Sequence, residues 1–340
     1  QPTGLTASIT PKTLTVSGVS VSNKVYDGLT AAVATTGTLV GLIPADNANV
    51  TLTQSANFTS SNVGDSIPVI VYESISGAAA ANYTVVQPSG LSANITPKSL
   101  TITGTTVANK VYDGSTVATV TGGTLVGLVS SDLANITFTK AASFSSTNAG
   151  NAIAIVMNDS ISGSAVGNYT LTQPTGITAN IAPKALTVTG TSIANKVYDG
   201  TTVAAISGGS LVGVVTGDSV TLNQAASFSQ PNAGTGLAVT VANTLTNNVA
   251  GNYTLTQPTG FTANITPAPI TVSITGQTKE YDASNIANLT AGTSSNAGSY
   301  SLSGFVSGQG AYINQTNASY NSANVADATT VVTSLTPPNY

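Results

Sequence analysis

A six-residue sequence, Asn-Lys-Val-Tyr-Asp-Gly, occurs three times in the chain without change, at residues 23–28, 109–114 and 195–200. A diverged copy, Thr-Lys-Glu-Tyr-Asp-Ala, occupies residues 278–283. The tyrosines of successive copies are separated by 86, 86 and 83 residues. A fixed period of this length is typical of tandem structural repeats, so it constrains the domain organisation before any local pattern is considered.

The period divides the chain into four repeats and a short leading segment. We name them repeat one (11–96), repeat two (97–182), repeat three (183–266) and repeat four (267–340), each long enough to bury a core. The leading segment, 1–10, has the sequence that closes each of the first three repeats. It is therefore predicted to be an orphan closing strand of a preceding or neighbouring repeat. Repeat four is divergent and is predicted to lack its own closing strand.

Short runs of alternating apolar and polar residues fill each repeat and predict strands. Residues 14–16, 50–52 and 67–75 are three of about seven such runs in repeat one. The Asn-Val-Gly sequence at 62–64 lies between two of them, and we expect its Asn and Gly to supply the positive φ of a tight hairpin. The pattern predicts an all-β fold of four small immunoglobulin-like β-sandwiches in tandem. Because only a few residues, including a proline, connect consecutive repeats, we expect an elongated rod.

The composition argues against several classes of protein. Only 6% of the residues are charged and the net charge is −4, so the chain has no basic face for nucleic acid. The sequence has no run of 18 apolar residues, so no membrane span is predicted. It has no His and no Cys, which removes the usual zinc ligands, disulfides and the base that activates a nucleophile. We therefore expect neither enzyme activity nor a cofactor.

Calcium is chemically allowed but has no support from the acidic residues. A calcium site needs about six to eight converging oxygens. Asp46, Asp132 and Asp218 instead recur singly, one in each of the first three repeats. No metal site is therefore predicted.

The repeated Tyr-Asp-Gly sequence has two interpretations, a ligand site in every repeat or a structural turn. We favour the turn, in which Asp caps its own backbone, Gly adopts positive φ and Tyr buries its ring. A second tyrosine, at the start of each closing strand, resembles a tyrosine corner. The residues assigned to this structural signature are Lys24, Tyr26, Asp27, Gly28, Lys110, Tyr112, Asp113, Gly114, Lys196, Tyr198, Asp199, Gly200, Lys279, Tyr281, Asp282, Tyr83, Tyr169 and Tyr253.

The signature lysines suggest one covalent alternative, an intramolecular Lys–Asn isopeptide bond. In repeat one it would join Lys24 to Asn94 of the closing strand, with Asp27 as the assisting acid, all buried together. The corresponding asparagines in repeats two and three are Asn180 and Asn264. The simpler interpretation is a half-exposed Lys–Asp pair worth about 0–1 kcal/mol.

The Lys-Val-Tyr-Asp-Gly cores and their Gly-Asn-Tyr-Thr closing sequences resemble the YDG and MBG-type repeats of bacterial filamentous-haemagglutinin-like surface adhesins. The resemblance covers essentially the whole chain, and repeat four is closer to the MBG variant. It implies a secreted protein at the bacterial cell surface, in which a repetitive β-rich stalk or fibre serves cell adhesion. It implies no catalytic activity.

We therefore expect a structural repeat region of a surface fibre or adhesin stalk. The partners expected are neighbouring copies of the chain or adjacent repeats of a longer one, placed head-to-tail. In the first case Leu5, Ala7 and Ile9 would complete repeat four of another subunit by strand donation, making the chain a filament subunit. In the second case the 340 residues are a window of a longer repeat protein.

A binding module is the alternative from a different functional class. It would grip carbohydrate or a host protein through exposed aromatic side chains. Apart from the terminal residue, only Tyr72, Tyr300, Tyr312 and Tyr320 are tyrosines outside the repeated signature. Three of them lie in repeat four, so an adhesive surface is expected there.

Overall fold

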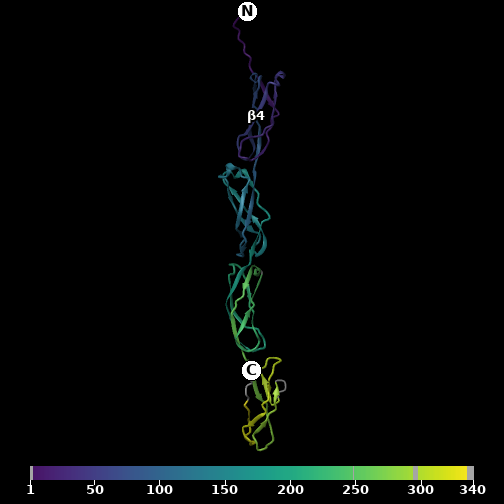
Figure 1. Ribbon diagram of the computed structural model, residues 1–340, viewed down its shortest axis with the longest axis vertical. Coiled ribbons are helices and arrows are strands. Elements are labelled where there is room, and N and C mark those ends of the chain that lie inside the picture. The colour runs from purple at the N-terminus through teal and green to yellow at the C-terminus, as the bar shows by residue number, and fades with distance from the viewer. Residues whose placement is uncertain (1–2, 248, 294–297, 335–340) are drawn as a thin grey trace. The chain divides into compact units, whose positions relative to one another are not determined.

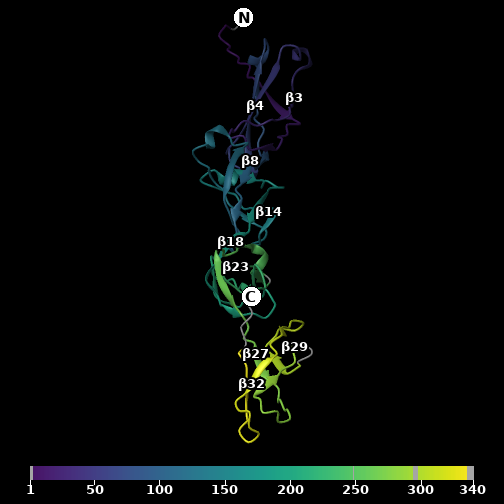
Figure 2. The same cartoon turned by 60° about the horizontal axis from the view of Figure 1, so that its bottom comes forward.

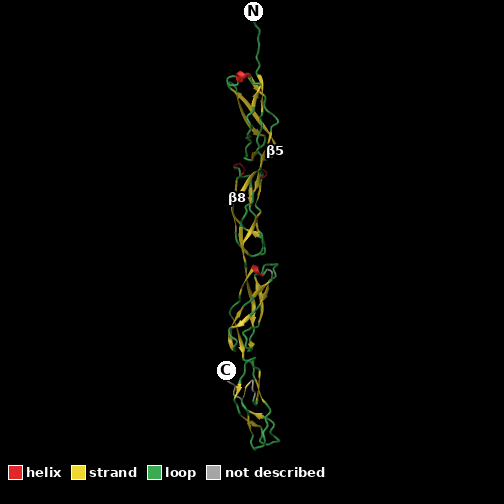
Figure 3. Ribbon diagram, turned by 90° about the vertical axis from the view of Figure 1, so that its right-hand side faces the viewer, coloured by secondary structure: helices red, strands yellow, loops and turns green. Residues whose placement is uncertain are grey.

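The computed structural model describes residues 3–247, 249–293 and 298–334. It contains two compact units, residues 1–183 and 184–340, which are described separately. The described residues form strands, and their only helices are single turns of 3-10 helix (Figure 3). These turns are η1 (Pro44–Asp46), η2 (Ala80–Asn82), η3 (Ser130–Asp132), η4 (Val166–Asn168) and η5 (Ala250–Asn252). The predicted all-β class is confirmed.

Repeat one contains seven strands, in keeping with the number expected from its alternating pattern. They are β1 (Lys12–Ser17), β2 (Lys24–Val25), β3 (Thr38–Val40), β4 (Thr51–Phe58), β5 (Gly64–Ser76), β6 (Tyr83–Val85) and β7 (Ser92–Thr96). They form a three-stranded sheet, β3-β1-β6, and a four-stranded sheet, β2-β7-β5-β4. Repeat one is the purple part of the ribbon in Figure 1, where β4 is labelled.

The first and last strands of repeat one pair in parallel. Lys12 of β1 lies opposite Tyr83 of β6, and Lys24 of β2 lies opposite Ile95 of β7. The other pairs, β1–β3, β4–β5 and β5–β7, are antiparallel. The N-terminal and C-terminal strands are therefore hydrogen-bonded side by side.

The hairpin between β4 and β5 differs from the expectation in one respect. Positive φ was expected within residues 62–64, but no residue there has it. It occurs instead at Ser66, whose φ is 50°. The loop 59–63 is longer than the two-residue turns that require positive φ. Ser66 instead belongs to a β-bulge, where the β5–β7 register shifts between Gly64 and Ile67.

Repeat two completes the first unit and has the same two main sheets, with more and shorter strands. Its strands are β8 (Lys98–Val107), β9 (Lys110–Val111), β10 (Val117–Ala118), β11 (Val120–Val126), β12 (Thr137–Thr139), β13 (Ala142–Phe144), β14 (Gly150–Met157), β15 (Ser160–Ser162), β16 (Tyr169–Leu171) and β17 (Thr178–Ala182). Its sheets are β11-β8-β16, β10-β13-β14-β17-β9 and β12-β15.

The second unit contains repeats three and four (Figure 2). Repeat three consists of β18 (Lys184–Ile193), β19 (Lys196–Val197), β20 (Ile206–Val212), β21 (Thr221–Asn223), β22 (Ala226–Phe228), β23 (Gly234–Val241), β24 (Thr244–Thr246), β25 (Tyr253–Thr256) and β26 (Phe261–Thr266). Its sheets are β20-β18-β25, β19-β26-β23-β22 and β21-β24.

Repeat four has shorter strands and smaller sheets. Its strands are β27 (Thr271–Ile274), β28 (Ile286–Asn288), β29 (Gly292–Thr293), β30 (Tyr300–Ser303), β31 (Tyr312–Ile313), β32 (Asn317–Tyr320) and β33 (Val331–Val332). They pair as β27-β30, β28-β32-β33 and β29-β31. Residues 338–340, where its closing strand was expected to begin, lie outside the described residues.

The same apolar positions are buried in each of the first three repeats. Leu14, Leu100 and Leu186, in the first strand of each repeat, are fully buried. Ile95, Ile181 and Ile265, in the closing strands, are 1% exposed. The burial of a complete aliphatic side chain contributes about 1.5–3 kcal/mol, so these positions stabilise every repeat in the same way.

Candidate functional site: the joint between repeats one and two

The Tyr-Asp-Gly sequence forms a tight turn after β2. The Asp27 carboxylate accepts a hydrogen bond from Leu29 N at 2.9 Å, and Gly28 has φ of +78°. The corresponding carboxylates in repeats two and three, Asp113 and Asp199, accept from Ser115 N and Thr201 N at 2.8 and 2.9 Å. This is the arrangement in which an aspartate caps its own backbone and glycine supplies left-handed φ.

The signature lysine is enclosed by the turn. Lys24 Nζ donates to the Asp27 carboxylate at 2.7 Å and to the backbone carbonyls of Leu29 and Ala31 at 2.6 and 3.0 Å. Its ammonium also lies 5.6 Å from the centre of the Phe58 ring. We call this arrangement the lysine clamp. Because the Lys24 side chain is only 17% exposed, the expectation of a half-exposed ion pair was wrong for the lysine.

The lysine clamp recurs in all four repeats. Each signature lysine lies 2.7 Å from the aspartate three residues later and over an aromatic ring. The hydrogen bond from Lys110 is the largest cause that lowers the pKa of Asp113 to about 2, and the bond from Lys196 does the same for Asp199. Each clamp thus holds a Lys–Asp ion pair beside an aromatic ring of its repeat.

The asparagines considered for isopeptide bonds have a different role. Asn94 Oδ1 accepts a hydrogen bond from Ser66 N at 2.7 Å, at the bulge in β5. Asn180 and Asn264 receive the equivalent bonds from Ala152 N and Gly236 N, both at 2.8 Å. The ammonium groups of the signature lysines instead donate to the acceptors of the lysine clamp, as Lys24 does to Asp27 and two backbone carbonyls. The structure therefore pairs neither group in the way the isopeptide hypothesis requires.

The signature also anchors the closing strand of its own repeat. Asn23 Oδ1 accepts from Asn94 N at 2.7 Å, and Tyr26 N donates to the Thr96 carbonyl at 2.9 Å. Thr96 is the last residue of β7, and repeat two begins with Pro97. The turn and its tyrosine are thereby held where one repeat meets the next.

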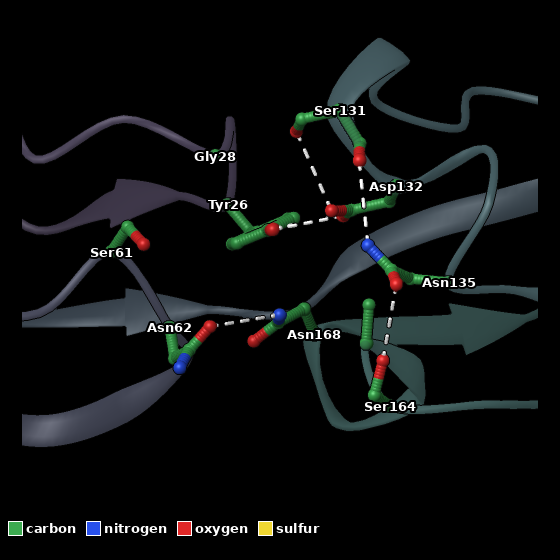
Figure 4. Close-up of a pocket in the computed structure, with 10 residues that line it drawn as sticks. Tyr26, Gly28, Ser61, Asn62, Ser131, Asp132, Asn135, Ser164 and Asn168 are labelled. Carbon is green, nitrogen blue, oxygen red and sulfur yellow. Dashed lines mark hydrogen bonds between the residues drawn. The ribbon is translucent and has the colours of Figure 1, made fainter.

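At this meeting point one carboxylate of repeat two binds two tyrosines. Asp132 Oδ2 accepts from Tyr26 of repeat one at 2.8 Å (Figure 4). The same oxygen accepts from Tyr169 of repeat two at 2.6 Å. The two rings pack edge-to-face, with centroids 5.4 Å apart and an interplanar angle of 81°. Tyr26, Asp132 and Tyr169 are each at most 6% exposed. Hydrogen bonds to a buried charged acceptor are among the stronger ones, each contributing about 1.5–3 kcal/mol.

A second set of hydrogen bonds lies beside the carboxylate. Asn168 Oδ1 accepts from Val63 N at 2.9 Å, and Asn168 Nδ2 donates to Asn62 Oδ1 at 3.2 Å. Figure 4 shows Asn62 and Asn168 facing one another across the same pocket as Tyr26 and Asp132. We call the set Tyr26, Asn62, Asp132, Asn168 and Tyr169 the joint.

Gly28 permits the close approach of the two repeats. A Cβ atom at Gly28 would lie 3.1 Å from Val129 Cγ1 and 3.2 Å from Ser131 Oγ. These distances are shorter than ordinary van der Waals contacts, so a side chain here would force Val129 and Ser131 to shift. The apolar core is continuous through the joint, since Tyr26 and Phe58 belong to one cluster with Leu100 and Tyr169.

A related contact occurs within the second unit. Tyr198 of repeat three receives a hydrogen bond from Gln309 Nε2 of repeat four. A Cβ atom at Gly200 would lie 3.1 Å from Val306 Cγ1. Gln309 follows Val306 as Asp132 follows Val129, and both make the same backbone bond, N to O at 2.9 Å. Repeat four therefore replaces the carboxylate of the joint by a neutral amide.

The tyrosines that begin the closing segment brace a distant loop. Tyr83 OH donates to Asp46 Oδ2 at 2.7 Å and accepts from Ile43 N at 3.4 Å. Tyr169 and Tyr253 bind Asp132 and Asp218 in the same way. A tyrosine corner bonds to backbone only a few residues upstream. Here the brace joins β6 to a carboxylate about 40 residues earlier in the same repeat.

Burial and the neighbouring carboxylate of Asp132 both raise the pKa values of the tyrosines at the joint. Burial of the phenol and its hydrogen bond to the carboxylate raise the pKa of Tyr169 to about 12, and the same causes raise the pKa of Tyr26. Ionisation of either hydroxyl would place two negative charges in contact in a buried site. The protonated phenols are therefore part of the joint.

This shift predicts a loss of stability in alkali. Since the folded pKa of Tyr169 exceeds the unfolded value of about 10, its contribution is complete below pH 10 and is lost as pH rises toward about 12. We expect the first unit to lose about 2–3 kcal/mol over this interval. Hydrogen exchange of β8 at increasing pH, corrected for intrinsic rates, measures the loss. In Tyr169→Phe the decline should become shallower, and an unchanged decline would contradict the assignment.

The remaining candidate residues do not form a shared surface. Tyr300 is fully buried, Tyr320 is partly buried, and Tyr312 and Tyr72 are 64% and 62% exposed in different repeats. Of the three tyrosines named for an adhesive surface on repeat four, Tyr312 alone is exposed. Leu5 and Ile9 of the leading segment are exposed, and residues 3–10 form no strand.

The chemistry available at the joint is adhesion between repeats. Within the described ranges no three His, Cys, Asp or Glu side chains lie together as metal ligands would. The joint itself offers one carboxylate, two phenols and two amides, and these groups bind one another. No helix in the described part of the chain is long and apolar enough to cross a membrane.

Sequence reasoning missed three members of the joint. Asp132 was treated as an isolated acid, Asn62 as a turn residue, and Asn168 only as part of a closing sequence. A signal was available, because acids recur at positions 46, 132 and 218 with the same 86-residue spacing as Tyr26, Tyr112 and Tyr198. This recurrence did not identify Tyr26 as the partner of Asp132, because the two residues are 106 positions apart in the sequence.

These features define a tandem all-β repeat protein in which each repeat carries a lysine clamp and repeats one and two meet at a tyrosine–carboxylate joint. The model of the YDG domain family matches residues 10–90, 96–176 and 182–260, which is more than half of the chain. The chain belongs to the YDG domain family. No curated protein and no solved structure matches it. The predicted YDG repeats are thus confirmed for three segments, and the MBG character of repeat four stays a prediction.

Proposed function

We propose that the chain is the structural repeat region of a secreted bacterial surface fibre or adhesin stalk, without catalytic activity. The observation that carries the proposal is the joint, in which a buried carboxylate of one repeat binds tyrosines of both. Such a contact couples neighbouring repeats, which is what a spacer needs and a set of independently moving domains does not. Each repeat would be an immunoglobulin-like sandwich of its two main sheets.

The strand order supports a load-bearing role. The first strands of repeat one, β1 and β2, pair in parallel with the last two, β6 and β7. A pull on the two ends of the repeat acts along these strands, so their hydrogen bonds are sheared together instead of opened one at a time. The lysine clamp adds a second fastening beside β2.

A sharper form of the proposal is head-to-tail assembly by strand complementation. Leu5 and Ile9 are 89% and 101% exposed, whereas Ala93 and Ile95, the counterparts of Ala7 and Ile9 in β7, are 5% and 1% exposed. Leu5, Ala7 and Ile9 therefore have the pattern of a closing strand without a repeat to close. Another copy of the chain, or an adjacent repeat of a longer chain, would supply that repeat.

Stretching the full chain between its two ends tests the load-bearing role. We expect three similar unfolding steps, one for each of repeats one to three. Each step should lengthen the chain by about 28–31 nm, less the length of the folded repeat. The control uses the same chain pulled through Thr51→Cys and Ser76→Cys, which lie opposite one another on β4 and β5 and would be unzipped. The chain has no native cysteine, so both attachment points are unique. Equal unfolding forces in the two geometries would contradict a load-bearing design.

A further inference from the structure

Repeat one carries, at its N-terminal end, the same groups with which repeat two receives Tyr26. Ile43, Asp46 and Tyr83 correspond to Val129, Asp132 and Tyr169. Tyr83 OH donates to Asp46 Oδ2 at 2.7 Å, as Tyr169 OH donates to Asp132 Oδ2 at 2.6 Å. A formed receiving site for a tyrosine is therefore present on repeat one.

The two receiving sites differ in how they are covered. Asp132 is 6% exposed and accepts from two tyrosines, whereas Asp46 is partly exposed and accepts from Tyr83 alone among the described residues. A carboxylate with unused acceptor capacity beside a buried tyrosine ring is suited to one further phenol. Charge complementarity excludes another carboxylate as the occupant.

Repeat four presents a donor of the required kind. Its clamp is formed, with Lys279 Nζ 2.7 Å from Asp282 and Ser284 N bound to the same carboxylate at 3.0 Å. Its tyrosine, Tyr281, is nevertheless 65% exposed, whereas Tyr26 in the joint is 4% exposed. The turn is thus formed as in repeat one, but the ring of its tyrosine is exposed to solvent.

The residues that would meet at such a contact differ from those of the joint at three positions. At the joint, Gly28 faces Ser131 so closely that a Cβ atom would lie 3.2 Å from the serine Oγ. In repeat four the glycine is replaced by Ala283, which keeps positive φ at 58°. In repeat one the serine is replaced by Ala45. The added methyl group of Ala283 is offset by the hydroxyl that is missing at Ala45. Ile43 occupies the position of Val129, whose Cγ1 would lie 3.1 Å from a Cβ atom at Gly28.

We infer that the Ile43–Asp46–Tyr83 site of one chain binds Tyr281 of a second copy, so that chains associate head-to-tail. The inference deepens the proposed function and rests on its head-to-tail form. In repeat one, Thr96 at the end of the closing strand accepts the backbone N–H of Tyr26. A donated strand ending at Thr10 would offer the same carbonyl to Tyr281, so strand donation and tyrosine binding would occur together.

Sedimentation velocity of the full chain over a range of concentrations tests the inference. We expect species in multiples of 33.6 kDa. Asp46→Ala and Tyr281→Ala should each weaken the association roughly 10-fold or more, as expected for loss of a charge-assisted hydrogen bond and a packed aromatic ring. Asp65→Ala and Tyr312→Ala, which alter an exposed acid and an exposed tyrosine elsewhere, should leave it unchanged.

A further variant separates this inference from the proposed strand donation. Ile9→Asp places a charge in the donated strand and should abolish association. If Ile9→Asp does so while Asp46→Ala and Tyr281→Ala associate as the wild type, strand donation stands and the tyrosine contact is wrong. If the wild-type chain stays a monomer at every concentration, head-to-tail association of copies is wrong as a whole. Because the Tyr281 side chain is exposed in the monomer, Tyr281→Ala should fold normally, and circular dichroism checks this.

Discussion

Replacing Asp132 by alanine should destabilise both repeats of the first unit, by about 2–5 kcal/mol in total. The substitution leaves the hydroxyls of Tyr26 and Tyr169 without an acceptor in a buried site, and each unpaired buried polar group costs about 1–3 kcal/mol. Hydrogen exchange of the full chain measures the loss repeat by repeat. The most informative amides are Tyr26 N and Leu29 N, which belong to repeat one although the altered residue is in repeat two.

Asp46→Ala is the matched control for this substitution. It removes the same carboxylate from the equivalent position but deprives only Tyr83 of its acceptor, so we expect about 1–2 kcal/mol, confined to repeat one. The difference between the two variants is the contribution of the contact across the joint. If both variants lose the same free energy, or if Tyr26 N keeps its protection in Asp132→Ala, the joint does not couple the repeats.

The sequence was sufficient for everything that depends on local pattern and period. The alternation of apolar residues placed seven strands in repeat one, and the spacing of the signature marked the repeats. The turn at Asp27 and Gly28 could be predicted from these two residue types alone. Asp27 accepts a hydrogen bond from a nearby backbone N–H, and Gly28 adopts positive φ. Interactions between residues close in sequence can be read from that sequence.

Interactions between distant residues could not be read in this way. Lys24 had Asp27 as an evident partner, but the carbonyls that complete its clamp and the Phe58 ring become visible only when β2 and β4 are placed in space. Asn94 could have paired with several groups. In the structure it binds Ser66 N, which the bulge in β5 places beside it. The pairing of Tyr26 with Asp132 depends on how one repeat ends against the next, and no local pattern encodes it.

Replacing Lys110 by methionine should destabilise repeat two by about 2–4 kcal/mol. Lys110 Nζ donates to the Asp113 carboxylate at 2.7 Å and to the carbonyls of Ser115 and Val117 at 2.8 and 3.2 Å, with its side chain 17% exposed. Methionine keeps the apolar stem over Phe144 but leaves these acceptors without their donor, and the removal of a hydrogen-bonded charge is expensive. Hydrogen exchange of β13 and β14, which pair beside the clamp, measures the loss.

The dependence on acid distinguishes the clamp from a general packing effect. Because Lys110 lowers the pKa of Asp113 to about 2, from an ordinary value near 3.8, wild-type stability is complete above that ordinary value and falls as pH decreases toward about 2. Lys110→Met should lose this part of the acid dependence together with its stability. Lys98→Met, in the same repeat but outside any clamp, should keep both. If Lys110→Met were as stable as Lys98→Met, the clamp would be an incidental ion pair, and the reason for a lysine in all four signatures would have to lie outside the stability of the fold.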